Sequence, residues 1–244
     1  MRSLRFALAA ASLIASTAFA SPTAPVNGVE YITMASPQPV NVVGKKVEVI
    51  EFFMYHCPHC NVLEPALAEW VKRQGDNIVF KRVHFPYAGA MDPEAHLYLT
   101  LEAMGKLPEF HAKVFHALHV EHKRLFSDAA IIDWVAANGI DKAKFLEFWN
   151  SFGVLTKLKR LPQIVDAYKI DGAPSIVVDG RYMTSPAQVG SASPGKSETE
   201  LSAMTTQVLD ALVAKVMKDS GAKPAAAAAP AAAVKAAPAK AATK

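Results

Sequence analysis

The spacing of hydrophobic residues predicts a strand, a helix and a second strand in the first third of the chain. Residues 47–54 are mostly apolar and predict a short buried strand. From Leu63 onward apolar residues recur at helical spacing, which predicts a helix over about 60–74 with Gly75 as its stop. Residues 77–85 predict a second strand. This order predicts a right-handed βαβ unit with parallel strands.

The middle of the chain has the period of helices, and the pattern changes again near the end. Residues 92–168 predict a helical core. Segments 175–178 and 181–183 then predict a hairpin with a tight turn between them, and 198–219 predict a final amphipathic helix. An α-helical insertion inside a small α/β fold explains this order. Start signals divide the helical block at Asp92-Pro93, Pro108, Ser127-Asp128 and Asp141.

The first twenty residues have the pattern of a secretory signal peptide. Arg2 and Arg5 give a positive start, residues 6–14 form an apolar stretch too short to span a bilayer, and Ala18-Phe19-Ala20 fits a signal peptidase site. An N-terminal membrane anchor is the alternative. The pattern favours an exported protein with a signal peptide at 1–20.

The other end is rich in Ala, Pro and Lys. Residues 221–244 lack the apolar pattern of a core and predict a disordered tail. The chain has a formal charge of +4. Without the two arginines of the signal and the four lysines of the tail, the folded part carries about −2. The basic pI therefore comes from the ends, and we expect no nucleic-acid partner.

The two cysteines form a single Cys-Pro-His-Cys motif, Cys57 to Cys60. A two-residue loop gains little stability from closure, so the pair indicates reactivity. Between a strand and a helix, the Cys57 thiolate faces the positive end of the helix, which lowers the thiol pKa. His59 adds a hydrogen bond or a positive charge, and Pro58 suits the first helical position. Cys60, more protected, suits the resolving role.

A metal site is the alternative for these residues. Four ligands at His56, Cys57, His59 and Cys60, within five residues of a helix start, cannot converge tetrahedrally, so we predict no metal. The other histidines are better explained by surface or packing roles. They are His84, His96, His111, His116, His119 and His122.

The segment from Glu51 to Cys60, Glu-Phe-Phe-Met-Tyr-His-Cys-Pro-His-Cys, resembles the active-site strand and turn of the DsbA family within the thioredoxin superfamily. The resemblance extends over the helical insertion, Gly172-Ala173-Pro174 and the closing hairpin and helix, nearly all of residues 27–219. It implies a thioredoxin-like fold with an inserted α-helical domain. The implied parts are a first thioredoxin-like part at 27–86, the insertion at 87–153 and a second part at 154–219.

The same resemblance implies roles for further residues. Glu51 would lie beneath the active site and assist proton transfer at the buried cysteine, paired with Lys81 or, with a different register, Arg82. An ordinary acid on a solvated strand face is the alternative. Pro174 is similar to the family's cis-proline, next to which a substrate peptide binds along Ala173, Pro174 and His59. Ala173 departs from the branched residue that the family more often has.

The function implied is that of a periplasmic dithiol oxidase acting as a monomer. Its Cys57–Cys60 disulfide would pass to newly exported, unfolded proteins with free thiols, and a quinone-linked inner-membrane oxidase would restore it. No cofactor is implied, because the disulfide is the redox group. An exported reductase or isomerase of the same fold is one alternative, and a non-enzymatic periplasmic binding module is another.

Overall fold

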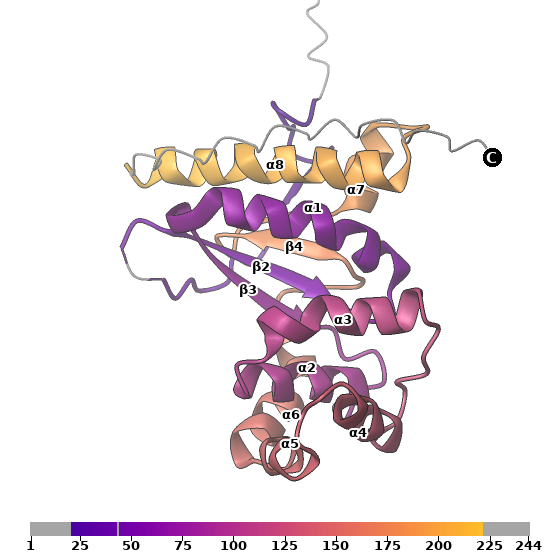
Figure 1. Ribbon diagram of the computed structural model, residues 1–244. Coiled ribbons are helices and arrows are strands. Elements are labelled where there is room, and N and C mark those ends of the chain that lie inside the picture. Colours follow the sequence, from indigo (N-terminus) through magenta and orange to yellow (C-terminus); the bar gives the residue numbers. More distant parts are fainter. Residues whose placement is uncertain (1–20, 43, 222–244) are drawn as a thin grey trace, which may run out of the picture.

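The computed structural model describes residues 21–42 and 44–221, so the predicted signal peptide and nearly all of the predicted tail lie outside the described residues. Within them a five-stranded sheet has the order β1-β5-β4-β2-β3. A layer of two long helices covers one face of this sheet, and a lobe of helices lies on the opposite side (Figure 1).

The central strand β2 connects the two halves of the fold. It pairs in parallel with β3 and antiparallel with β4, as a βαβ unit followed by a hairpin requires. The predicted parallel pair and hairpin are therefore confirmed, whereas the short edge strand β1 had not been predicted. The strands are β1 (Ile32–Thr33), β2 (Val47–Phe53), β3 (Ile78–His84), β4 (Ser175–Val178) and β5 (Tyr182–Thr184).

All seven residues of β2 are buried, and their alternation assigns them to two faces. Val49 packs in one cluster with the buried residues of α1 (Pro58–Gln74) and α8 (Glu198–Asp219). Phe52 packs on the other face, in a cluster with residues of α6 (Phe152–Ala167). Because Glu51 has the parity of Val49, its side chain lies on the face covered by α1, the helix that carries the cysteines.

The helical lobe encloses its own hydrophobic core, which reaches the cysteines. The predicted caps Asp92, Ser127 and Asp141 each accept a hydrogen bond from a backbone N–H in the first turn of their helix. The predicted limits of the insertion, 87 and 153, fall before α2 and in the first turn of α6. The helices of the lobe are α2 (Pro93–Ala103), α3 (Leu107–His119), α4 (Asp128–Ala137), α5 (Lys142–Trp149) and α6 (Phe152–Ala167).

Helix α1 ends where its sequence predicts. Gly75 has a φ of 49°, in the left-handed region that glycine adopts without strain, and a short 3-10 turn (Gly75–Asn77) leads into β3. A short helix between β5 and α8, α7 (Pro186–Ala192), had not been predicted. In the described segments, no helix combines the length and apolar content needed to cross a membrane.

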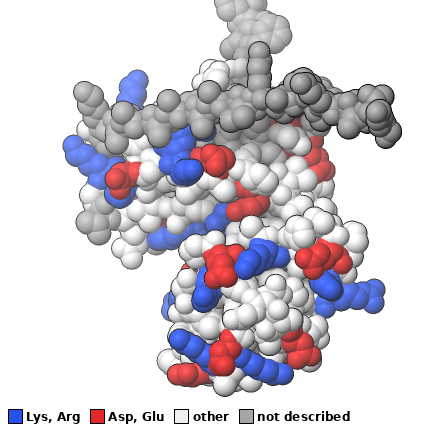
Figure 2. Space-filling view, viewed as in Figure 1, with Lys and Arg blue, Asp and Glu red and all other residues white. Residues whose placement is uncertain are grey.

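Charged side chains of both signs are interspersed over the face shown in Figure 2, without a stripe of one sign. A partly buried contact between α1 and α8 nevertheless depends on a charge. Asp210 of α8 accepts hydrogen bonds from Trp70 Nε1 (2.7 Å), Gln74 Nε2 (2.6 Å) and an Arg73 guanidinium nitrogen (2.9 Å), all on α1. The ring of Trp70 is fully buried, so its N–H relies on this partner.

We expect Asp210→Ala to lower the free energy of unfolding by about 2–3 kcal/mol, because it leaves the buried indole N–H without an acceptor. The matched control is Glu102→Ala, which removes an exposed ion pair with Lys157 and should cost less than about 1 kcal/mol. Chemical denaturation of both variants measures the difference. Equal losses would mean that Asp210 does not hold α8 on α1.

Candidate active site

The turn after β2 places Cys57 at the start of α1. Cys57 is the N-cap residue with an extended backbone (φ −75°, ψ 117°), and Pro58 takes the first helical position as predicted. The carbonyl of Cys57 accepts the first hydrogen bond of the helix, from the N–H of Asn61 (3.1 Å). Cys60 therefore lies one turn further on, fully buried, while Cys57 is 5% exposed.

Both cysteines are free thiols in this structure, and their surroundings make them unequal. A hydrogen bond from the Cys60 thiol lowers the pKa of Cys57 to about 6, and the backbone N–H groups of Cys60 and His59 and the charge of His59 contribute, against the opposing effect of burial. The pKa of Cys60 is raised, because its proton is held by Cys57 and the side chain is buried. Cys57 is thus the thiolate and Cys60 the protonated partner.

The loop before β4 faces the cysteines from the other half of the fold. The peptide bond between Ala173 and Pro174 is cis, which confirms the predicted cis-proline. Cys57 Sγ lies 3.4 Å from the carbonyl oxygen of Ala173. The reactive sulfur therefore lies beside a backbone segment that is available to a bound peptide.

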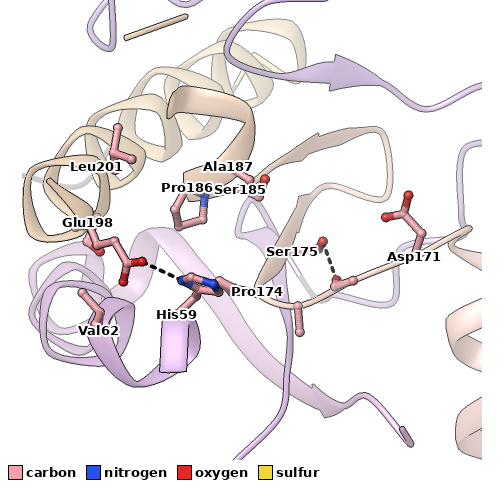
Figure 3. Close-up of a pocket in the computed structure, with 13 residues that line it drawn as sticks. His59, Val62, Asp171, Pro174, Ser175, Ser185, Pro186, Ala187, Glu198 and Leu201 are labelled. Carbon is pink, nitrogen blue, oxygen red and sulfur yellow. Dashed lines mark hydrogen bonds and ion pairs between the residues drawn. The ribbon is translucent and has the colours of Figure 1, made fainter. Parts of the chain in front are cut away.

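A cavity of about 350 Å³ opens beside this loop, between α1 and the start of α8 (Figure 3). His59 points across it, and its Nδ1 lies 2.9 Å from Glu198 Oε1 at the first residue of α8. The predicted hydrogen bond from the His59 ring to Cys57 is thus replaced by this ion pair, although the charge of His59 still lowers the pKa of Cys57. The lining includes Val62, Asp171, Ala173, Pro174, Pro186, Ala187 and Leu201.

Glu51 is buried beneath α1, which rules out the alternative of a solvated acid. Burial raises its pKa to about 7, although the charge of Arg82 acts in the opposite direction. Arg82 Nε donates to Glu51 Oε2 (2.7 Å), and the same guanidinium holds both oxygens of Glu64 (2.9 Å each). The field of Glu51 in turn raises the pKa of Cys60.

The prediction that Lys81 is the partner of Glu51 is wrong. In the parallel register Glu51 pairs with Arg82, and Lys81 pairs with Ile50. Residues paired in this way share a face of the sheet, so a shift of one residue moves the lysine to the other side. There Lys81 Nζ donates to Glu48, which is also buried.

The buried cluster extends to residues that had not been recognised as part of the site. Glu64 has a lowered pKa because, against the cost of burial, His111 and Arg82 stabilise its charge. His111 Nδ1 also lies 3.0 Å from the hydroxyl of Tyr55. The spacing of Cys60 and Glu64 on one helix could have indicated that Glu64 lies beneath the cysteines.

The histidines predicted to have surface or packing roles lie partly in the core and partly on the surface, but His111 belongs to the buried polar cluster with Glu64. His84, His96 and His111 are buried, and His96 stacks on Trp149 with 3.5 Å between ring centroids. His116 is exposed on α3 and pairs with Glu121 (3.0 Å). No group of three or more potential ligands in the described part of the chain is arranged to hold a metal ion.

The amino-acid sequence of the chain is similar to those of proteins with a known activity. Residues 90–202 match the DSBA-like thioredoxin domain. The chain is 43% identical over 183 residues to the thiol:disulfide interchange protein DsbA of Bordetella parapertussis, covering 75% of this chain and 87% of the relative. It is 41% identical over 204 residues to that of Burkholderia cepacia, covering 84% and 92%.

Solved structures show the same likeness. The Pseudomonas aeruginosa DsbA crystal structure aligns with a TM-score of 0.69 at 32% identity, over 80% of this chain and 95% of that one. The oxidoreductase DsbA from Xylella fastidiosa aligns with a TM-score of 0.66 at 26% identity, over 78% and 97%. The predicted thioredoxin-like fold with a helical insertion is confirmed.

The unequal thiols predict selective alkylation of the reduced protein. At about pH 7 iodoacetamide should modify Cys57 and spare Cys60, because only the thiolate is nucleophilic. The rate at Cys57 should fall about tenfold between about pH 7 and about pH 5, as the thiolate takes up a proton. Fragment-ion mass spectrometry assigns the modified cysteine. Equal labelling, or an unchanged rate down to this pH, would contradict the assignment.

Proposed function

The chain belongs to the DsbA family of thiol:disulfide oxidoreductases, and from that premise we propose that it acts as a dithiol oxidase that passes its Cys57–Cys60 disulfide to substrate proteins. The observation that carries the proposal is the opposite protonation of the two thiols. A stabilised Cys57 thiolate is a good leaving group, which favours the reduced form of the protein and the transfer of its disulfide. A depressed thiol pKa and an oxidising disulfide are established traits of this family.

The reaction proceeds in two thiol–disulfide exchanges. A substrate thiolate attacks Cys57 Sγ of the disulfide, and Cys60 leaves as a thiolate that takes up a proton. A second substrate thiolate then attacks the substrate sulfur of the mixed disulfide and expels the Cys57 thiolate. The substrate loses two electrons and two thiol protons and gains a disulfide, and the protein disulfide becomes a thiolate and a thiol.

Glu51 is suited to supply the proton that Cys60 needs. A carboxyl group with a pKa of about 7 is divided between its two forms near neutral pH, so it can give up a proton and recover it. Its charge raises the pKa of Cys60, so the protonation of the two groups is linked. Arg82 and Glu64 hold the carboxyl group in place.

The cavity beside Pro174 is suited to the substrate polypeptide. The Ala173 carbonyl lies next to Cys57 Sγ, and an extended peptide can pair with this backbone while its apolar side chains enter the space lined by Val62, Leu201 and Pro186. His59 lies at the same cavity. This arrangement accepts many sequences, as expected for a protein that acts on varied unfolded chains.

The place of action and the route of reoxidation follow from the sequence and the family. The signal-like residues 1–20 favour export to the periplasm, where newly exported proteins with paired thiols are the substrates. A quinone-linked oxidase of the inner membrane would restore the disulfide. Because the family is enzymatic, a non-enzymatic binding module has no support. The alternative that remains is a protein of the same fold that reduces disulfides.

The reduction potential of the Cys57–Cys60 pair decides the direction. After equilibration of the mature protein with glutathione buffers, we expect a value far above the thioredoxin level of about −270 mV, because the Cys57 thiolate stabilises the reduced form. Separation of the reduced and oxidised forms gives the equilibrium constant. A value near that of thioredoxin would make the protein a reductase.

Cys60→Ala, first converted to its Cys57–glutathione mixed disulfide with oxidised glutathione, should trap mixed disulfides with reduced exported proteins, because a substrate thiolate attacks Cys57 Sγ and expels glutathione. Without the resolving thiol, the bond between Cys57 and a substrate sulfur cannot be reversed by attack from within the protein. Non-reducing electrophoresis should show adducts that reductant releases. Cys57→Ala is the matched control and should form none, since the buried Cys60 does not reach a substrate. Adducts through Cys60 alone would overturn the assigned order of attack.

A further inference from the structure

A second imidazole lies beside the nucleophile and takes no part in the reaction described so far. His56 directly precedes Cys57 in the chain, and its side chain is 30% exposed. Its Nδ1 lies 2.6 Å from Glu94 Oε2, and its backbone N–H donates to the same oxygen (3.2 Å). The Cα atoms of these adjacent residues lie about 3.8 Å apart, and the charge of the Cys57 thiolate acts on the imidazole.

Glu94 depends on this contact for its charge balance. Its side chain is only 4% exposed, and Oε1 is buried with no hydrogen-bond partner among the described residues. His84 Nε2 is 3.8 Å from Oε2, but burial lowers the pKa of His84 to about 3, so this ring stays neutral. In the described part of the chain, His56 is therefore the basic side chain that compensates the buried carboxylate when its imidazole is protonated.

Glu94 also lies in the first turn of α2. Glu94 follows Asp92, the N-cap residue, and Pro93, and a carboxylate in the first turn is stabilised by the helix dipole. The hydrogen bond with Glu94 raises the pKa of His56, and the charges of Glu94, Asp92 and the Cys57 thiolate act in the same direction. The interaction of two charges is mutual, so a protonated His56 stabilises the thiolate.

Groups on other elements also face His56. Tyr87 places its ring edge-to-face on the imidazole, with 5.4 Å between centroids. The segment after α3 shares a cavity with His56, and its cations oppose protonation of the ring, whereas the acids of α2 favour it. The cationic and titratable residues there are His119, the last residue of α3, and His122, Lys123 and Arg124 beyond it.

We propose that the His56–Glu94 ion pair is a second electrostatic support of the Cys57 thiolate, separate from the pair formed by His59 and Glu198. His56 is a positioning residue that acts on the nucleophile through its charge, and Glu94 keeps it charged and close. This inference rests on the proposed role of Cys57 as the sulfur that substrates attack. It adds a residue outside the Cys-Pro-His-Cys motif to those that set how readily the protein gives up its disulfide.

The test compares His56→Gln and Glu94→Gln with His116→Gln, which removes the histidine of the exposed His116–Glu121 pair on α3. Ultraviolet absorbance of the thiolate gives the Cys57 titration, and glutathione equilibria give the constant for reduction of one protein disulfide by two glutathione thiols. For His56→Gln we expect a higher Cys57 pKa and a constant about three- to tenfold smaller, as for one partly exposed charge. This corresponds to about 15–30 mV.

The pH profile separates an electrostatic role from a structural one. The difference in the reduction constant between wild type and His56→Gln should be full between the Cys57 pKa of about 6 and the raised pKa of His56. It should vanish above this range, where the imidazole is neutral, and below it, where Cys57 is protonated. Glu94→Gln should lower the pH at which the imidazole becomes neutral and the difference vanishes, because Glu94 raises the pKa of His56. His56→Lys should restore the low Cys57 pKa and keep the reduction constant high above the His56 pKa as well, because lysine stays charged throughout this range.

The outcomes distinguish this inference from the proposed function. A low Cys57 pKa in wild type that His56→Gln and His116→Gln both leave unchanged would overturn the role of His56 alone. A Cys57 pKa in His56→Lys that is as high as in His56→Gln would also overturn the role of His56. An ordinary Cys57 pKa in wild type would contradict the proposed function itself, whatever the variants show.

Discussion

The site depends on one contact, the hydrogen bond from the Cys60 thiol to the Cys57 sulfur across the first turn of α1. It exists because β2 ends at Phe53 and the helix starts at Pro58, which places the two sulfurs one turn apart. This contact makes two chemically identical groups unequal, one a thiolate and the other a buried thiol. The position of α1 must be fixed for it to persist, and α8 holds that helix through Asp210.

The polar cluster under Cys60 has no evident stabilising purpose. Burying Glu51, Arg82 and Glu64 costs solvation free energy, and apolar side chains of similar volume commonly stabilise a core as well or better. A buried carboxyl group with a pKa of about 7, whose charge raises the pKa of Cys60, is instead explained by the proton that this sulfur gains and loses. The cost in stability and the gain in reactivity therefore come from the same burial.

Local periodicity predicted the elements well, because it reports which face of a strand or helix is buried. The helix expected over 198–219 occupies those residues, and the strand expected over 47–54 is one residue shorter. Periodicity does not report which distant segment covers a face. The partner of Glu51 depended on a register of one residue, and Glu198 and Glu94 reach the motif only through tertiary packing. The seven residues of α7 are too few for a pattern.

The stabilised thiolate also connects the redox chemistry to the stability of the fold. The pKa of Cys57 is about 6 in the folded protein, below its ordinary value of 9.0. Because the pKa of Cys57 is lower in the folded protein than in the unfolded chain, the thiolate stabilises the fold. This stabilisation is complete above the pKa of the unfolded chain and is lost as the pH falls through about 6. The oxidised protein has no thiolate and gains nothing from this term. The disulfide is therefore the less favoured state, unlike a structural disulfide, and transferring it to a substrate releases the free energy that the thiolate gains from its surroundings.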